Sequence, residues 1–93
     1  MCGQMEECRM RIDEIDDELL RLLNERSKLV AELGIIKKTQ GMPLLDRIRE
    51  DYVLTRVREK NCGPLDEEGA LKIFELIISE SRRIEAGLLR YTS

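Results

Sequence analysis

Residues 5–38, MEECRMRIDEIDDELLRLLNERSKLVAELGIIKK, decide the fold of this chain. They contain no proline, and Gly34 is their single glycine. Their apolar residues recur at alternating spacings of four and three, with one interruption: Cys8, Ile12, Ile15, Leu19, Leu22, Leu29, Leu33 and Ile36. This spacing predicts one long helix that packs along its whole length. The interruption is Arg26, which stands where the pattern requires an apolar residue.

Two expectations follow from this helix. An unpaired guanidinium is costly in an apolar seam, so a negative group should meet Arg26, either a carboxylate of the protein or a bound anion. The helix should also be about 50 Å long at 1.5 Å per residue, which is longer than a compact domain of this mass. A second copy of the chain is the simplest cover for it, and we therefore expect a homodimer of long helices packed together.

Composition places the chain among small all-α proteins. Its 93 residues are enough for one domain, residues 1–93, and the scarcity of aromatic residues, threonine and valine favours helices. The net charge of −3 comes from interleaved charges, which argues against nucleic-acid binding. No apolar run is long enough for a membrane span. Three widely spaced cysteines and no histidine exclude a metal site of ordinary spacing and predict reduced thiols in a cytoplasmic protein.

Two further helices are expected after the long one. Residues 39–43 contain Gly41 and Pro43, which end a helix, and the next helix should run over about 46–61. The segment 61–64 is the second break, and Asp66 is a suitable N-cap for a third helix over about 66–90. The apolar stripe of the third helix is expected at Ala70, Phe74, Ile77, Ser81, Ile84 and Leu88.

Several polar residues fall on or beside these apolar faces. Lys37 lies eleven residues after Arg26, so the two cations point the same way, about 20° apart around the helix. Each could instead pair with a glutamate or extend to water, and that explanation is weaker for Arg26 in mid-seam. Arg9 lies about 100° from this face. Taken alone it is expected to be a surface residue, and if it serves an anion site, that site belongs to the partner chain.

The second and third helices add mainly acidic groups. Asp46, Arg49 and Glu50 share one helical face, although an N-cap with an exposed ion pair is the favoured explanation of these three residues taken alone. Ser81 lies on the apolar stripe and could bond back to its own helix. Glu85, one turn later, requires a cation or a proton. The combined set is rich in cations and suits a small dianion such as a dicarboxylate, because arginine binds carboxylates in a bidentate manner.

At these spacings the chain resembles the all-helical, type II (AroQ-class) chorismate mutases from Arg9 to Glu85. The matching segments are Arg9-Met-Arg-Ile-Asp-Glu-Ile-Asp-Asp-Glu-Leu-Leu20, Glu25-Arg26, Gly34-Ile-Ile-Lys37, Pro43-Leu-Leu-Asp46-Arg-Ile-Arg49-Glu50 and Phe74-Glu-Leu-Ile-Ile-Ser-Glu-Ser81. The resemblance implies an intertwined dimer of three-helix chains and a Claisen rearrangement of chorismate to prephenate, in phenylalanine and tyrosine synthesis. It also implies that the reaction needs no cofactor. The protein would instead select the folded conformer of the substrate and stabilise the charge that develops in the transition state.

The resemblance also implies a role for each cation-site residue. Arg9 of the partner chain and Arg26 would bind the two substrate carboxylates. Arg49 would support this cationic site, and Ser81 would assist at a carboxylate.

The remaining roles concern the breaking bond and the ring. Lys37 would donate to the ether oxygen, and Asp46 and Glu50 would hold the ring hydroxyl. Glu85 departs from the common bacterial pattern, which has glutamine there. Because a carboxylate donates only when protonated, we expect Glu85 to carry a proton in the active form, favoured by burial and opposed by Lys37.

Two alternatives stay open at this point. An isochorismate–pyruvate lyase shares the fold and a similar pericyclic chemistry, although the complete set of Lys37, Asp46, Arg49 and Glu50 favours the mutase. A non-catalytic helical module that binds a chorismate-like ligand, or dimerises a larger enzyme, would keep the fold without turnover. An assay with each substrate separates these possibilities.

Overall fold

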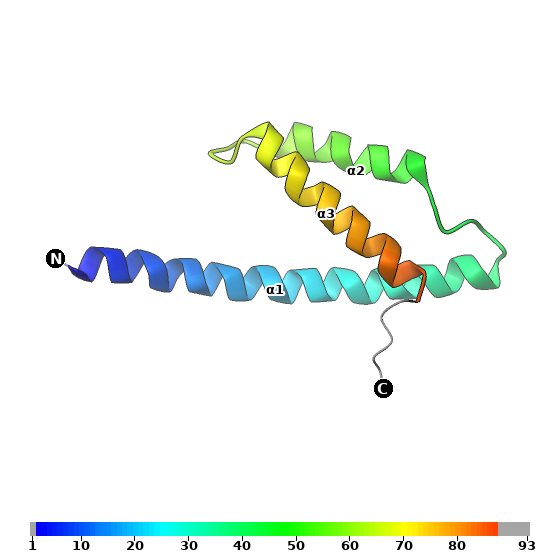
Figure 1. Ribbon diagram of the computed structural model, residues 1–93, viewed down its shortest axis with the longest axis horizontal. Coiled ribbons are helices and arrows are strands. Elements are labelled where there is room, and N and C mark those ends of the chain that lie inside the picture. The colour runs from blue at the N-terminus through cyan, green and yellow to red at the C-terminus, as the bar shows by residue number, and fades with distance from the viewer. Residues whose placement is uncertain (1, 88–93) are drawn as a thin grey trace.

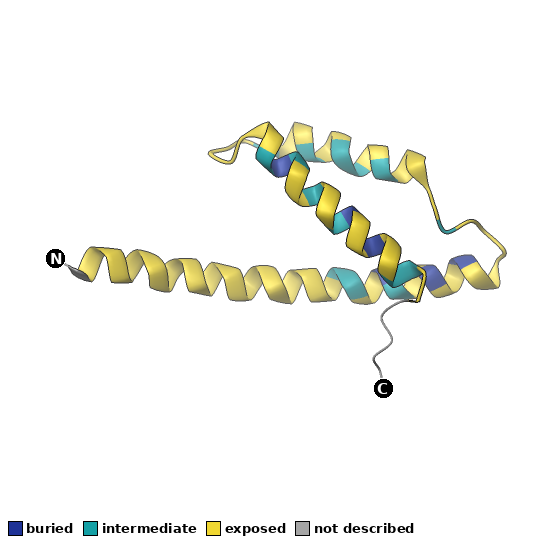
Figure 2. Cartoon of the chain, viewed as in Figure 1, coloured by how far each residue is buried: buried dark blue, intermediate teal, exposed yellow. Residues whose placement is uncertain are grey.

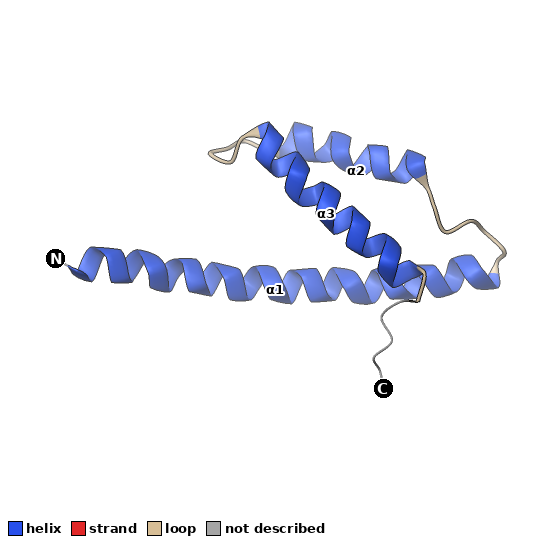
Figure 3. Ribbon diagram, viewed as in Figure 1, coloured by secondary structure: helices blue, strands red, loops and turns tan. Residues whose placement is uncertain are grey.

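The computed structural model describes residues 2–87, which form three α helices: α1 (Cys2–Thr39), α2 (Arg47–Lys60) and α3 (Glu67–Glu85) (Figure 3). The predicted all-α fold with a long N-terminal helix is confirmed. None of the described helices carries a stretch apolar enough to cross a bilayer. Cys8 and Cys62 are exposed, unpaired thiols.

The helix ends follow the capping residues. Gly41 adopts a positive φ of 67° after α1, and the Met42 N–H donates to the Lys37 carbonyl at 2.8 Å, closing the last turn. At the start of α2 the Asp46 carboxylate accepts from the Arg49 N–H at 3.0 Å. At the start of α3 the Asp66 carboxylate accepts from the Gly69 N–H at 2.8 Å. Both aspartates are therefore N-caps.

The expected end of the third helix at residue 90 is wrong. The helix ends at Glu85, and Ala86 follows as the C-cap. Gly87 has a φ of 78°, a left-handed conformation that stops a helix and favours glycine. Its N–H donates to the Ile84 carbonyl at 2.9 Å. Leu88, which was expected on the apolar stripe, lies outside the described residues.

The three helices form a flat, open arrangement that measures 60 × 36 × 14 Å. Figure 1 shows α2 and α3 as an antiparallel pair, with the C-terminal end of α3 crossing the C-terminal part of α1. Within residues 2–87, α3 packs against both other helices, whereas α1 and α2 do not contact each other. The N-terminal half of α1 extends away from the other two helices.

One chain buries little apolar surface by itself. The buried apolar side chains of the described residues are Val30, Ala70 and Ile78. Figure 2 shows the N-terminal half of α1 exposed along its whole length. The seam residues Ile12, Ile15 and Leu19 are each more than half exposed, at 53%, 58% and 52%. An apolar face of this extent is typical of a surface that contacts another molecule.

Gly34 sets the distance between α1 and α3. A Cβ atom at this position would lie 2.8 Å from the carbonyl oxygen of Glu85 and 2.9 Å from its Cα. Both atoms belong to the backbone, so a side chain at position 34 would push α3 away from α1. The glycine is buried and allows the end of α3 to lie directly on α1. This close approach brings Glu85 to the level of Lys37.

Candidate active site

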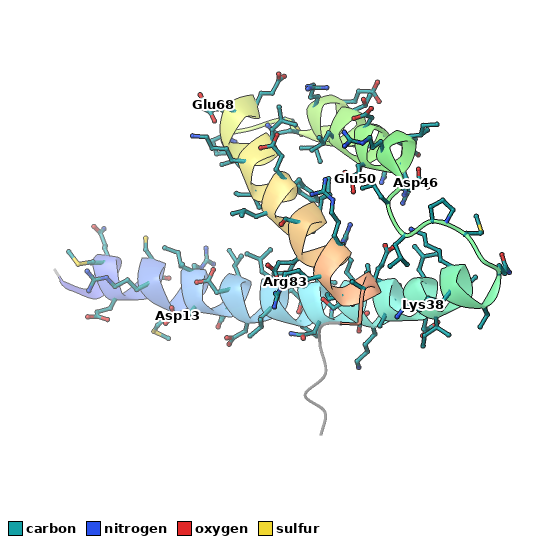
Figure 4. The ribbon with its side chains drawn as sticks, turned by 45° about the vertical axis from the view of Figure 1, so that its right-hand side comes forward. Asp13, Lys38, Asp46, Glu50, Glu68 and Arg83 are labelled. Atoms are coloured by element: carbon teal, nitrogen blue, oxygen red, sulfur yellow. The ribbon has the colours of Figure 1, made fainter. Side chains whose placement is uncertain are left out.

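A cavity of about 590 Å³ lies between the C-terminal part of α1, the start of α2 and the C-terminal part of α3. Figure 4 shows two of its acidic residues, Asp46 and Glu50, near the start of α2. Every predicted site residue except Arg9 lines this cavity: Arg26, Lys37, Asp46, Arg49, Glu50, Ser81 and Glu85. Its apolar wall consists of Leu29, Val30, Leu33, Ile36, Met42, Leu44, Val53 and Ile78. The volume is in the range of small-molecule binding sites.

Arg26 and Ser81 connect α1 to α3 within the cavity. The Arg26 Nη1 donates to the Ser81 hydroxyl at 2.5 Å, and that hydroxyl donates to the Ile77 carbonyl at 2.9 Å. Ser81 thus bonds back to its own helix, as expected, and also accepts from a cation. Among residues 2–87 no carboxylate lies within 4.0 Å of the Arg26 guanidinium. Burial, and then the nearby Arg49, lower the pKa of Arg26, while Glu85 opposes them.

Lys37 and Glu85 form the second link between α1 and α3. The Lys37 Nζ lies 2.7 Å from the Glu85 Oε1, and the two side chains are 10% and 12% exposed. The same Nζ donates to the Leu44 carbonyl at 2.9 Å, which also ties the loop before α2 to α1. Lys37 and Arg26 face the same cavity, as their spacing of eleven residues predicted. The geometry of this pair is that of a largely desolvated ion pair.

Asp46 and Arg49 stand at the first turn of α2. One carboxylate oxygen of Asp46 caps the helix, and its second oxygen retains acceptor capacity. The Arg49 guanidinium carbon lies 5.1 Å from the centre of the Tyr52 ring, a cation–π geometry. Among the described residues Arg49 has no carboxylate within 4.0 Å. Its positive charge is therefore available to a ligand.

Arg82 also lines the cavity, although no pattern in the sequence indicated it as a site residue. Its Nε and Nη2 donate to the two oxygens of Glu50 at 2.8 and 2.6 Å. Glu50 thereby meets a bidentate partner on α3 and not the helical neighbour Arg49. The hydrogen bonds from Arg82 are the largest cause that lowers the pKa of Glu50. The two residues are 32 positions apart, so no helical spacing in the sequence indicates this pair.

Arg9 does not reach the cavity of its own chain. It is exposed on the N-terminal half of α1, about 25 Å along the helix axis from Arg26. Within its own chain Arg9 is therefore a surface residue. That it serves the cavity of a second chain stays a prediction.

A second, smaller cavity of about 320 Å³ lies between the C-terminal end of α2 and the start of α3. Val53, Val57 and Phe74 contribute to its apolar lining, and Arg56 and Lys60 are its cations. It contains none of the predicted site residues and no carboxylate among its lining residues. The chemistry of the chain is therefore concentrated in the larger cavity.

Charged side chains form most of the polar lining of the larger cavity. Four cations line it (Arg26, Lys37, Arg49 and Arg82) against three carboxylates (Asp46, Glu50 and Glu85). The chain has no histidine, so the pairing of a nucleophile with a histidine base is excluded. These features are typical of a helical protein that binds a small dicarboxylate-like molecule and acts on it through orientation and electrostatics.

The comparison with known proteins agrees with this class. The family model of chorismate mutase type II matches residues 8–86, and the chain belongs to this family. A chorismate mutase of Methanocaldococcus jannaschii is 35% identical, over 99% of this chain and 94% of that protein. The solved structure of chorismate mutase form II from Thermus thermophilus superposes with a TM-score of 0.88 at 32% identity, covering 97% of this chain and 99% of that one.

The activity of the chain is therefore that of a chorismate mutase, an isomerase. A bifunctional chorismate mutase/prephenate dehydratase of Neisseria gonorrhoeae is 39% identical over 86% of this chain, which corresponds to 22% of that longer protein. The same helical unit thus occurs both as nearly the whole of a protein and as part of a larger one.

Proposed function

We propose that the larger cavity is the active site, in which chorismate rearranges to prephenate, and that the working unit is a homodimer. One observation carries this proposal. The guanidinium groups of Arg26 and Arg49 line the cavity, and no carboxylate among residues 2–87 lies within 4.0 Å of either. Arg26 is half-buried and loses part of its hydration there, and an anion bound in the cavity would offset that cost. A substrate with two carboxylates supplies that anion.

The cations bind the substrate and fix its conformation. Arg26 binds one carboxylate through two parallel hydrogen bonds, and Arg9 of the partner chain binds the other carboxylate. Arg49 adds positive charge at this end of the cavity. Ser81, which accepts from Arg26 at 2.5 Å, keeps the guanidinium in place and assists at the carboxylate. Holding both carboxylates selects the bent conformer in which the two reacting carbons are close together.

Lys37 and Glu85 act at the ether oxygen. In the rearrangement the carbon–oxygen bond breaks as a carbon–carbon bond forms, and no atom is gained or lost. The ether oxygen gains negative charge in the transition state, so a donor already in place lowers the barrier. Lys37 donates one hydrogen bond. Glu85 donates a second after it takes up a proton, which the arrival of a doubly negative substrate favours.

Asp46 and Glu50 hold the ring hydroxyl at the α2 side of the cavity. Both carboxylates keep acceptor capacity beyond the contacts described above. Their distance from Lys37 is set by the packing of the helices, because Asp46 is the N-cap of α2 and Glu50 lies in its first turn. They thus orient the ring relative to the breaking bond.

The homodimer completes both the fold and the site. The apolar seam of α1 is exposed over the N-terminal half of the helix, and a second chain would cover it. In an antiparallel arrangement the partner's helix would pass close to the cavity. Arg9 of that helix is then the missing cation of the site.

A spectrophotometric assay of chorismate loss with the purified protein tests the proposal. Prephenate should form in proportion to the chorismate consumed. The same protein should release no pyruvate from isochorismate. Pyruvate release would favour the lyase, and tight binding of chorismate without turnover would favour the non-catalytic module.

A further inference from the structure

Arg82 is the cation of the cavity to which the proposed mechanism gives no role. Its neighbour Ser81 contacts Arg26 of α1, and Glu85 on the next turn contacts Lys37 of α1. Arg82 points instead to α2, where its guanidinium donates to both oxygens of Glu50 at 2.8 and 2.6 Å. A single turn of α3 therefore connects the cations of α1 to a carboxylate of α2.

We propose that Arg82 is a positioning residue that fixes the Glu50 carboxylate for the ring hydroxyl of the substrate; this inference rests on the proposed function. The packing of α2 makes such a support necessary. This helix has no buried residue and, within residues 2–87, contacts α3 but not α1. The location of Glu50 relative to the α1 cations is thus set by the packing of α2 on α3, together with the loop that the Lys37–Leu44 hydrogen bond ties to α1. A bidentate pair restrains a carboxylate in direction as well as in distance.

Arg82 also keeps the cavity attractive to a dianion. With Arg82 present, four cations face three carboxylates. Without it the cations equal the carboxylates in number, and Glu50 loses its bidentate partner. Each oxygen of Glu50 still has a free lone pair for the substrate hydroxyl after the pair has formed. Arg82 can therefore support Glu50 without competing with the substrate for it.

The pair should be visible in the pH dependence of turnover. Arg82 lowers the pKa of Glu50 first through its hydrogen bonds and then through its charge; Arg47 on α2 acts in the same direction, and burial and Asp46 oppose them. The other charged groups that line the cavity around Glu50 are Arg26 and Lys37 of α1, Arg49 of α2 and Glu85 of α3. A lowered pKa keeps Glu50 ionised at pH values at which a free carboxylate takes up a proton. Loss of Arg82 should therefore move the acidic limb of kcat/KM to higher pH.

The experiment compares Arg82→Met with the matched control Arg83→Met. Arg83 is the next residue of α3, pairs with Glu80 on the same helix and does not line the cavity. Arg82→Met should lower kcat/KM about tenfold, mainly through KM, because a loosely held Glu50 binds the hydroxyl less well. Its acidic limb should lie at higher pH than in the wild type. Arg83→Met should change neither quantity.

Two further measurements separate positioning from simple stability. In a Glu50→Gln background, Arg82→Met should cost no more than about twofold, because the group it positions is already gone. Arg82→Lys, which keeps the charge and loses the fork, should lie between wild type and Arg82→Met in KM. NMR titration of the Glu50 carboxyl should show a higher pKa in Arg82→Met, and this readout requires no turnover.

The outcomes distinguish the two proposals. A folded wild-type protein without mutase turnover would contradict the proposed function. An active wild type in which Arg82→Met matches Arg83→Met in KM and in the acidic limb would overturn the role of Arg82 alone. The same conclusion follows if Arg82→Met keeps its full effect in the Glu50→Gln background.

Discussion

The Nζ of Lys37 lies 2.7 Å from the Oε1 of Glu85, and this pair joins α1 to α3 inside the larger cavity. Its members come from helices that touch because Gly34 has no side chain. In the proposed reaction both groups must turn toward the ether oxygen of the substrate, and the carboxyl group must hold a proton when it donates. The pair is thus both a structural link and the centre of the proposed chemistry.

Glu85→Gln should change the pH dependence of turnover. An amide donates a hydrogen bond at any pH, whereas a carboxyl group donates only when protonated. The wild-type kcat should therefore rise toward acidic pH, and the variant should show a flat profile between pH values of about 5 and 8. Rate measurements with saturating chorismate across this range test the difference. A wild-type profile that is flat over the same range would contradict the requirement for a protonated Glu85.

Binding should also be accompanied by proton uptake. Calorimetry with a non-reacting dicarboxylate analogue, repeated in buffers of different ionisation enthalpy, counts the protons taken up. The wild-type site should take up protons on binding if Glu85 becomes a hydrogen-bond donor in the complex, since a carboxyl group donates only when protonated. Glu85→Gln should take up none. Equal proton uptake by the two proteins would show that a group other than Glu85 takes up the proton.

Gly34→Ala should damage the site and the packing together. The added Cβ would lie 2.8 Å from the Glu85 carbonyl oxygen, so α3 must move away from α1. We expect a loss of about 1–3 kcal/mol in the free energy of unfolding and at least a tenfold loss of kcat/KM. Chemical unfolding and the mutase assay measure these effects.

Gly3→Ala is the matched control for this substitution. Nothing lies within 4 Å of a Cβ at position 3 of the same helix. The variant should be unchanged or slightly more stable, because alanine favours a helix over glycine by up to about 1 kcal/mol. Equal behaviour of the two variants would show that the close approach at Gly34 is unimportant.

Mixing two inactive variants should restore activity if Arg9 serves the partner's site. Arg9→Ala and Arg26→Ala each disable both sites of their own homodimer. A mixed dimer contains one site with both arginines intact and one site with neither. Co-expression or unfolding and refolding of the mixture should therefore recover up to about one quarter of wild-type turnover with random mixing of protomers. No recovery from a mixture that forms mixed dimers would contradict a role of Arg9 in the partner's site.

Acid should weaken the contact between α2 and α3. Arg82 lowers the pKa of Glu50 below the ordinary value of 4.5, so the ionised form is favoured by folding. The stabilisation is present above that value and is lost as the pH falls through the lower, folded-state pKa. The difference in melting temperature between wild type and Glu50→Gln should therefore shrink in this acidic range, at a fixed protein concentration. A difference that does not depend on pH would contradict the role of this charge.

The three helices, and the face of α1 that Arg26 and Lys37 share, could be predicted from the sequence. The seam of residues 8–36 and the caps Gly41 and Asp66 predicted three helices, and the spacing of Arg26 and Lys37 predicted one common face. These features depend on local geometry, which a regular helix repeats along its length. The end of α3 was misplaced because the apolar stripe was followed through Gly87, whose left-handed conformation stops the helix.

The contacts between helices could not be predicted in the same way. The sequence predicted a carboxylate of the protein or a bound anion beside Arg26, and it did not indicate the hydrogen bond to the Ser81 hydroxyl, which depends on the angle of α3. The fork between Arg82 and Glu50 likewise depends on how α2 lies on α3. Helix packing angles are set by many side chains together, and no spacing within one helix specifies them.

The most direct test of the account is the rate of chorismate loss with Arg26→Ala. This change removes a cation that the cavity holds without a carboxylate partner, so it should leave helical content and dimer mass unchanged. We expect kcat/KM to fall about 100- to 1000-fold, the usual effect of removing one electrostatic partner of a transition state. A folded, dimeric Arg26→Ala protein with near-normal kcat/KM would contradict the assignment of this cavity as the active site.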